Sequence, residues 1–449
     1  MVLAEFINTA MRRFERRNCR PGPVRRAGGM LKRLMKRGVG PGIITEIQNR
    51  RLRNIISFAY RNSPFYRKTF QAAGIKPGDI KSQADLFRIP FTTSAQLREW
   101  REFLCIPADA LSAVFATSGT TGEPKRVYYS YRDLQVMANF YGAAIRTVFS
   151  GPMVALIALP MGQGLWIGGA AAARAVERAG GLPLPVGALE PQETLLWMRR
   201  FSPNVIFSSP SYMTALTREA ERQNCRLSVS MILTAGELLT DQQKWLFREY
   251  WQAQVYDSYG STEIGSAQTI CLSECNAFHL NDLHIITEII DPATGLAADE
   301  GELVFTTLER EAMPLIRYRS GDLARRAVCK CWLPLSAIEL AGRTDDMIVA
   351  GDMNLYGNVI ANALLEVPGA TGRVAIEVSR QRLTDTLLLK VEGAAVNAET
   401  VREVLLRIYP ELRVNTGNEN LTLQIEPTGK LDGQLKNVSI KDQRRQSSI

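Results

Sequence analysis

The sequence lacks the features of an exported or membrane-inserted protein. Residues 1–17 contain no uninterrupted apolar core of the kind that a signal peptide needs. Residues 153–173 carry no formal charge and are long enough to span a bilayer, but one proline and four glycines interrupt them, as in a strand, a loop and a helix start. We therefore expect a soluble protein that has no membrane partner.

Other absences narrow the class further. No internal repeat and no low-complexity tract appears, and a content of 46% hydrophobic and 22% charged residues excludes a disordered chain. Seven cysteines without a secretory signal indicate a reducing, cytoplasmic compartment, in which clustered thiols bind metal more often than they form disulfides. A length of 449 residues predicts two or three domains.

The positive charge is concentrated near the N-terminus. The net charge is +9, and residues 11–37 hold eleven basic side chains: Arg12, Arg13, Arg16, Arg17, Arg20, Arg25, Arg26, Lys32, Arg33, Lys36 and Arg37. Such a segment binds nucleic acid or an anionic membrane, or it is a solvated helix that concentrates polyanionic substrates. Because no nucleic-acid-binding module follows it, we favour the second interpretation and expect no nucleic-acid partner.

The pattern of apolar residues predicts an α/β fold. Strands are expected at 153–159, 204–207, 231–236 and 254–260, and helices at 45–60, 170–179, 211–223 and 240–250. This alternation predicts a large domain with mostly parallel sheets, followed by a β-rich subdomain. After Arg343, expected strands at 373–379, 386–393 and 421–426 and helices at 356–366 and 398–408 predict a small α+β domain. We divide the chain into a basic extension (1–44), a large domain (45–342) and a small domain (343–449).

A loop rich in glycine and hydroxyl groups lies in the first third of the large domain. Residues 117–125 read TSGTTGEPK, which is not the GxxxxGK[ST] pattern of a Walker A loop. Glycines permit close backbone approach, and N–H groups, hydroxyls and one ammonium are donors for phosphoryl oxygens. The alternative is a solvent-facing turn. The candidate phosphate-binding residues are Ser118, Gly119, Thr120, Thr121, Gly122 and Lys125.

Three more polar segments follow in order: YDSYGSTE at 256–263, RYRSGD at 317–322 and GRTDDM at 342–347. The first lies at the end of an expected strand, where open α/β sheets bind ligands. Its Glu263 carboxylate is a ligand suited to Mg²⁺, and Asp322 is suited to accept from both ribose hydroxyls. Each segment taken alone also fits a solvated polar turn.

Together, the order and spacing of the four segments resemble the adenylate-forming superfamily of acyl-CoA synthetases, nonribosomal adenylation domains and luciferases. Within it the chain looks most like the phenylacetate–CoA ligase group, through residues 63–93, 286–295 and 301–326. The resemblance implies that Tyr259 stacks near adenine, Thr262 contacts the α-phosphate and Glu263 binds Mg²⁺. It also implies that Asp322, assisted by Arg343, holds the ribose. The remaining nucleotide contacts implied are Gly236, Glu237, Asp257, Ser258 and Gly260.

The same resemblance implies further roles. The acyl pocket is expected at Gly162, Trp166, Ser209 and Ala235, and the hinge of a mobile small domain at Asp345. The adenylation lysine of relatives follows a glycine near the C-terminus, which selects Lys430 here. Alignment on the trailing Val438 puts Gln434 at that position instead, so Lys436 stays open as the alternative.

Four cysteines and one histidine form a candidate metal site. Cys329 and Cys331 offer two thiolates in one turn, and Cys275 with His279 precedes them, with Cys271 as the alternative to Cys275. Three thiolates and one imidazole complete a four-coordinate structural zinc site, and some relatives carry a similar cluster. The alternative is a group of reduced thiols that binds nothing.

The leading hypothesis is an AMP-forming acid–thiol ligase that uses ATP, Mg²⁺ and CoA, with structural zinc as an additional expectation. Its acid is expected to be aromatic or arylalkanoic, by resemblance. A second hypothesis keeps adenylation but changes the acceptor to a carrier-protein thiol, an amine, or nitrite in a diazotase-like variant. A third is a basic nucleic-acid or membrane-surface binder with a vestigial adenylating fold. A carrier protein and a second copy of the chain stay open as partners.

Overall fold

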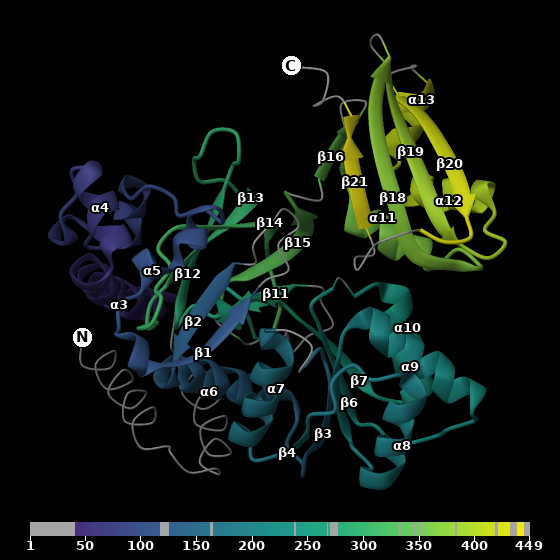
Figure 1. Ribbon diagram of the computed structural model, residues 1–449, viewed down its shortest axis with the longest axis horizontal. Coiled ribbons are helices and arrows are strands. Elements are labelled where there is room, and N and C mark those ends of the chain that lie inside the picture. The colour runs from purple at the N-terminus through teal and green to yellow at the C-terminus, as the bar shows by residue number, and fades with distance from the viewer. Residues whose placement is uncertain are drawn as a thin grey trace. The chain divides into compact units, whose positions relative to one another are not determined.

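The structure is a computed structural model, shown in Figure 1. It describes residues 41–116, 125–161, 165–237, 239–266, 268–269, 277–331, 333, 335–344, 347–350, 353–381, 384–417, 421–431 and 438–443. Contacts divide the chain into two units, and Ala341 begins the long continuous part of the second, which also takes in Thr240–Gln242 and Gly321–Leu323. Each unit is described by itself. The predicted domain limits and the hinge at Asp345 stay predictions, and Asp345 lies outside the described residues.

A five-stranded parallel sheet forms the centre of the first unit. Its order is β4 (Leu182–Leu184), β3 (Val154–Ala158), β5 (Val205–Ser208), β6 (Met231–Ala235) and β7 (Gln254–Ser258). The helices that connect these strands are α7 (Ile167–Arg178), α8 (Pro191–Phe201), α9 (Pro210–Arg222) and α10 (Asp241–Trp251), and α6 (Tyr131–Val148) precedes β3. The parallel sheet, its four predicted strands and the predicted helices at 170–179, 211–223 and 240–250 are therefore confirmed.

The sheet is buried on both faces, which explains why its strands read as continuous apolar runs. Because successive side chains of a strand point to opposite faces, Leu156 and Ile206 pack with helices α8, α9 and α10, whereas Ala155 and Val205 pack with α6 and α7. Figure 1 shows these two groups of helices on opposite sides of the strands. Helices α6 and α8 were not among the predicted elements.

A second sheet of the unit provides the predicted β-rich part. Its order is β10 (Gln268–Thr269), β11 (Phe278–Leu280), β15 (Ala337–Arg343), β14 (Tyr318–Ala327), β13 (Glu300–Thr307) and β12 (Ile285–Ile290). Two antiparallel strand pairs flank the parallel sheet in the sequence. Strand β1 (Leu111–Ala116) pairs with β2 (Arg126–Ser130) before it, and β8 (Gly260–Ser261) pairs with β9 (Gly265–Ser266) after it.

The N-terminal layer of the unit is helical. It consists of α3 (Pro41–Asn62), α4 (Pro64–Ala72), α5 (Trp100–Phe103) and four 3₁₀ helices, at Pro77–Asp79, Gln83–Arg88, Gln96–Glu99 and Ala108–Ala110. Its core joins side chains of α3 and α4 to Val127 and Tyr129 of β2 and to Tyr318 of β14. Tyr129 and Tyr318, which border the candidate site, are thus held by the core of this layer.

The second unit is an α+β structure with its own core. Strands β20 (Leu421–Thr428), β19 (Thr384–Gly393), β18 (Ala370–Gln381) and β21 (Val438–Asp442) form one sheet in that order. The other elements are β16 (Met347–Ala350), β17 (Met353–Tyr356), α11 (Gly357–Leu364), α12 (Ala398–Ile408) and α13 (Glu411–Gly417). The strands and helices predicted after Arg343 are confirmed. Within the described ranges, no helix combines the length and the apolarity that crossing a bilayer requires.

Candidate active site

Eight of the predicted nucleotide and acyl residues lie at one edge of the parallel sheet, at the carboxyl ends of β5, β6 and β7 or in the loops that leave them. Thr234 and Ala235 of β6 pair with Asp257 and Ser258 of β7, so the carboxyl ends of these strands are in register. Ser209 follows the neighbouring β5. Since open parallel sheets bind ligands outside the carboxyl ends of their strands, this edge is the expected place for a nucleotide.

Asp257 is a half-buried carboxyl group at this edge. Burial raises its pKa to about 6, against hydrogen bonds from Thr234, Ser258 and Leu239 that lower it. The Thr234 hydroxyl donates to Oδ1 at 2.7 Å and the Ser258 N–H donates to the same oxygen at 3.0 Å. Asp257 is therefore fixed in orientation, and near neutral pH its charge is easily neutralised.

The Gly-Glu turn after β6 is built around a glycine that needs its special conformation. Gly236 has φ +88°, and a Cβ there would meet nothing within 4 Å, so the space above it is open. Glu237 accepts from the N–H and the hydroxyl of Ser211 at 2.9 and 2.7 Å, which ties the turn to the first turn of α9. The glycine requirement thus falls on Gly236, and Ala235 needs no such freedom.

Glu263 is the most strongly held carboxylate of the predicted set. It is 6% exposed, and its Oε1 accepts from Lys125 Nζ at 2.9 Å and from the Tyr318 hydroxyl at 2.9 Å. Burial acts to raise the pKa of Glu263, but the charge of Lys125 and the hydrogen bonds from Lys125 and Tyr318 lower it below its ordinary value. The structure therefore brings two predicted residues of separate motifs into one ion pair.

The backbone next to Glu263 is held by two residues that the sequence analysis did not single out. The Tyr129 hydroxyl donates to the carbonyl of Thr262 at 2.7 Å, and Arg310 Nη1 donates to the carbonyl of Glu263. Tyr318 was also missed as a site residue, although it lies inside the RYRSGD motif. Its only signal was that position, and nothing local distinguished Tyr129 or Arg310 from core and surface residues.

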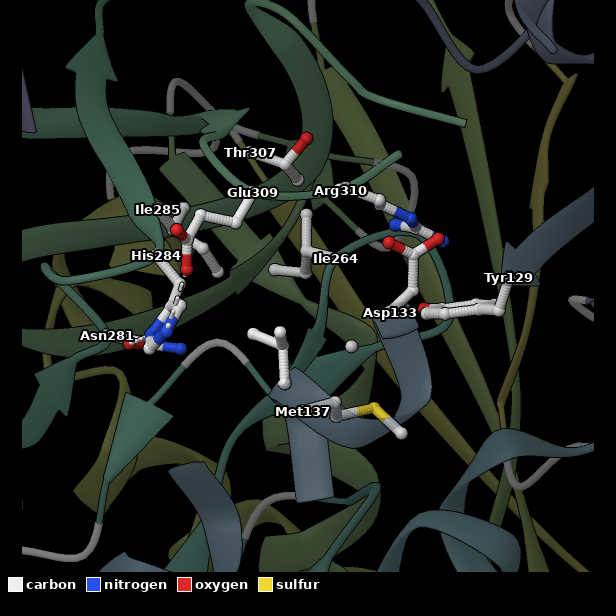
Figure 2. Close-up of a pocket in the computed structure, with 12 residues that line it drawn as sticks. Tyr129, Asp133, Met137, Ile264, Asn281, His284, Ile285, Thr307, Glu309 and Arg310 are labelled. Carbon is white, nitrogen blue, oxygen red and sulfur yellow. Dashed lines mark hydrogen bonds and ion pairs between the residues drawn. The ribbon is translucent and has the colours of Figure 1, made fainter. Parts of the chain in front are cut away.

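A cavity of about 60 Å³ lies behind this loop (Figure 2). Tyr129, Asp133 and Arg310 lie on one side of it, and Asn281, His284 and Glu309 lie on the other. His284 Nδ1 is 2.9 Å from Asn281 Oδ1, and its Nε2 is 3.5 Å from Glu309. His284 is thus a hydrogen-bonded buried residue in this cavity.

Two of the described acyl-pocket residues lie at helix starts, and the third, Ala235, ends β6. Trp166 immediately precedes α7 and is 42% exposed, and Ser209 precedes α9, where its hydroxyl accepts from the N–H of Tyr212 at 3.3 Å. Tyr259 contacts Phe278, with ring centroids 6.2 Å apart. The assignment of an acyl group to this region stays a prediction.

In the second unit the predicted ribose ligand is paired with its predicted assistant. Arg343 Nη1 contacts Asp322 Oδ1, and the Thr344 N–H donates to the Gly321 carbonyl at 2.7 Å. Gly321 has φ +78°, and a Cβ there would lie 3.1 Å from Arg343 Nη2. A side chain at Gly321 would therefore displace the guanidinium from Asp322.

Lys430 lies just after β20, also in the second unit, and is exposed. The N–H of the next residue, Leu431, donates to Glu392 Oε2 at 2.7 Å, and Arg373 contacts the same oxygen at 2.9 Å. The start of the segment that carries Lys430 is thus anchored to β19. Its rival Lys436 lies outside the described residues.

Three of the predicted zinc ligands meet. The ligand atoms of His279, Cys329 and Cys331 all lie within 4.8 Å of one another, and Cys331 Sγ is 3.0 Å from His279 Nε2. His279 Nδ1 is 3.1 Å from the Leu335 carbonyl, which only accepts, so Nδ1 carries the proton and Nε2 keeps the lone pair that a metal needs. These residues fit zinc.

Several predicted residues lie outside the described residues, and nothing structural is concluded about them. They are Ser118, Gly119, Thr120, Thr121, Gly122, Gly162, Cys271, Cys275, Asp345 and Lys436.

The chain is similar to known adenylate-forming enzymes. A family model described as AMP-binding enzyme matches residues 72–304. The phenylacetate-coenzyme A ligase of Aromatoleum evansii is 32% identical over 357 residues, which cover 77% of this chain and 81% of that protein. The phenylacetate-coenzyme A ligase of Escherichia coli (strain K12) is 30% identical over 381 residues, which cover 82% and 86%.

A solved structure extends the likeness to the fold. The 2-hydroxyisobutyryl-CoA ligase in the postadenylation state, in complex with 2-HIB-AMP, matches with a TM-score of 0.74 at 22% identity over 91% of each chain. The extent and identity of the sequence matches confirm the resemblance that the four ordered motifs predicted. The chain belongs to the AMP-binding enzyme family and, within it, to the phenylacetate–CoA ligase-like group of adenylate-forming enzymes.

Proposed function

We propose that the protein joins a carboxylic acid to coenzyme A in two steps, with an acyl adenylate between them. The observation that carries the proposal is the buried ion pair between Lys125 of the glycine/hydroxyl segment and Glu263 of the YGSTE segment. Two sequence relatives are named phenylacetate-coenzyme A ligases, so we propose an aromatic or arylalkanoic acid as substrate.

The first step brings two anions together, because a carboxylate attacks the α-phosphorus of ATP. Positive charge and oriented donors must therefore offset the repulsion, and no protein nucleophile is needed. Lys125 supplies an ammonium, Thr262 a hydroxyl for the α-phosphate, and Asp322 with Arg343 the ribose contacts. In the second step the CoA thiol attacks the acyl carbon and releases AMP.

Glu263 is the residue that would hold Mg²⁺. A carboxylate oxygen in a buried setting fits a hard cation, which would supply charge neutralisation at the phosphates. Without such a cation, the Lys125 ammonium at 2.9 Å balances the buried charge. Because Lys125 and a cation compete for the same carboxylate, we propose that Lys125 turns from Glu263 to the phosphates when Mg²⁺-ATP binds.

The second unit would supply the movable part. We propose that it turns about Asp345 between the two half-reactions, and that Lys430 reaches the reacting carboxylate during the first. Lys430→Ala should then abolish adenylation and spare thioester formation from supplied acyl adenylate. Full adenylation by that variant would move the role to Lys436.

We also propose that His279, Cys329 and Cys331, with Cys275 or Cys271, hold a structural zinc ion. Purified protein should contain about one zinc per chain. His279→Ala should lose the metal and lower the thermal midpoint, as measured by elemental analysis and calorimetry. Wild-type protein that contains no zinc when purified, or that keeps the same thermal unfolding midpoint after zinc is removed, would contradict this.

The proposed function is tested by pyrophosphate release with a panel of acids, with and without CoA. Release that depends on phenylacetate or a related acid, followed by thioester on adding CoA, is the expected result. Release without thioester would favour an amine, a carrier-protein thiol or nitrite as the acceptor. Retention on DNA or liposomes without any acid-dependent release would favour the surface-binding alternative.

A further inference from the structure

The turn that carries Thr262 and Glu263 is short and depends on its surroundings for its shape. It forms the tip of the hairpin β8–β9, whose strands are each two residues long and in which Ser261 pairs with Gly265. A hairpin of two such short strands has little stability of its own. Other parts of the unit must therefore set the position of its side chains.

Two side chains bind consecutive carbonyls of that tip from behind. The Tyr129 hydroxyl donates to the Thr262 carbonyl at 2.7 Å, and Arg310 donates to the Glu263 carbonyl. The Arg310 guanidinium also lies over the Tyr129 ring, 3.9 Å from its centroid. Tyr129 is 3% exposed and Arg310 7% exposed, so both are shielded from solvent where they bind the carbonyls of the tip.

The two residues are themselves tied together through Asp133. Its carboxylate accepts from the N–H groups of Glu311 and Ala312, at 2.8 and 3.0 Å, and from the N–H of Ser130 at 3.0 Å. The first two residues follow Arg310, and the third follows Tyr129. Figure 2 shows Tyr129, Asp133 and Arg310 on the same side of the cavity.

Gly265 permits the tip to come this close. It has φ +72°, and a Cβ there would lie 3.1 Å from the sulfur of Met137 and 3.6 Å from the Tyr129 hydroxyl. A larger residue would push the tip away from α6 and from Tyr129. Backbone shape and side-chain contacts thus select one position for the tip.

We infer that Tyr129 and Arg310 are positioning residues for adenylation: they hold the Thr262 and Glu263 carbonyls so that the hydroxyl and the carboxylate meet the α-phosphate and its divalent cation. The inference rests on the proposed function, in which Thr262 and Glu263 have those roles. Neither residue needs to touch substrate. Groups that orient a metal ligand typically contribute 10- to 100-fold to affinity or activity.

The chain offers a matched control pair. Arg226 lies over the Tyr250 ring, 4.4 Å from its centroid, and the Tyr250 hydroxyl donates to the carbonyl of Cys225 at 2.8 Å. Arg226 also donates to a backbone carbonyl, that of Tyr250, at 3.3 Å. This pair repeats the stacking and the phenol-to-carbonyl bond, but it holds no residue of the four motifs.

The experiment compares Tyr129→Phe, Arg310→Lys and Arg310→Met with Tyr250→Phe and Arg226→Met. Each variant is assayed for acid-dependent pyrophosphate release over a Mg²⁺ titration, and separately for thioester formation from supplied acyl adenylate and CoA. Wild-type release tests the proposed function, and only the ratio of variant to wild type tests this inference. If Arg310→Met is insoluble, Tyr129→Phe and Arg310→Lys carry the comparison.

We expect Arg310→Met to lower adenylation about 10- to 100-fold and to raise the Mg²⁺ concentration for half-maximal rate. Tyr129→Phe should lower adenylation about fivefold, since one hydrogen bond is lost, and Arg310→Lys should keep part of the rate. Thioester formation from acyl adenylate should stay within about twofold for all variants, as should both reactions of the control pair. Equal losses in both half-reactions, or wild-type adenylation and Mg²⁺ dependence in all three variants, would overturn the inference.

Discussion

Asp257 is half-buried and Glu263 is buried in the same motif, and their pKa values move in opposite directions. Burial is the largest influence on each. Asp257 receives hydrogen bonds mainly from neutral groups, and its pKa rises to about 6. Glu263 contacts the Lys125 ammonium at 2.9 Å, and its pKa falls. An adjacent counter-charge therefore decides which of the two stays ionised.

The comparison separates two tasks within the proposed site. A carboxylate binds a cation in its ionised form, and Lys125 favours that form of Glu263. Asp257 lies at the strand edge where a nucleotide base would lie, and a weakly charged acceptor suits a neutral ring. We therefore propose that Glu263 holds the cation and that Asp257 lies on the base side of the nucleotide.

The largest expected effect comes from removing the counter-charge. Lys125→Met should leave the Glu263 carboxylate buried without its cation and lower the free energy of unfolding by about 3 kcal/mol, as measured by urea titration. It should also abolish adenylation. The double variant Lys125→Met/Glu263→Gln should recover most of the stability without recovering activity. Equal stability of Lys125→Met and wild type would contradict the role given to the ion pair.

The second effect concerns Asp257 and depends on pH. Asp257→Asn keeps an oxygen that accepts from Thr234 and Ser258 but cannot ionise. Because the folded pKa of about 6 exceeds the ordinary 3.8, stability from this group is present in full below pH 3.8 and is lost as the pH rises through 6.

Asp257→Asn should therefore become more stable relative to wild type as the pH rises from 4 to 7, by on the order of 2 kcal/mol. Paired denaturation curves at several pH values measure the difference. A difference that does not change with pH would show that Asp257 titrates normally.

The smallest effect concerns the neutral donor to Glu263. Tyr318→Phe removes a hydroxyl that donates to Oε1 at 2.9 Å but leaves Lys125 in place. We expect a loss of about 1 kcal/mol in the free energy of unfolding, well below the loss for Lys125→Met. A larger loss than for Lys125→Met would show that the Tyr318 hydroxyl, and not the Lys125 ammonium, contributes more to the stability of the buried Glu263.

The sequence predicted the parts of this site that are local in the chain. The apolar alternation predicted the parallel sheet, and the motif around 256–263 placed Asp257 and Glu263 at a strand end. The order of the motifs predicted the family. These features depend on neighbouring residues or on a short repeating pattern, which a single sequence contains.

The residues that the sequence did not reveal act over long separations. Tyr129 and Thr262 are 133 positions apart, and Arg310 and Glu263 are 47 apart. A tyrosine in an apolar strand is typical of a core, and an arginine among charged residues is typical of a surface. Only the packing of β2 and the segment after β13 against the hairpin tip shows that they meet.

In the proposed reaction, a substrate carboxylate attacks the α-phosphorus of ATP at this site. Incubation of the protein with ¹⁸O-labelled phenylacetate, ATP, Mg²⁺ and CoA, followed by mass spectrometry of the nucleotide product, tests it directly. We expect AMP that carries one ¹⁸O atom from the acid, formed together with thioester, and no label transfer by Lys430→Ala. Unlabelled AMP, or ADP with labelled phosphate, would contradict it.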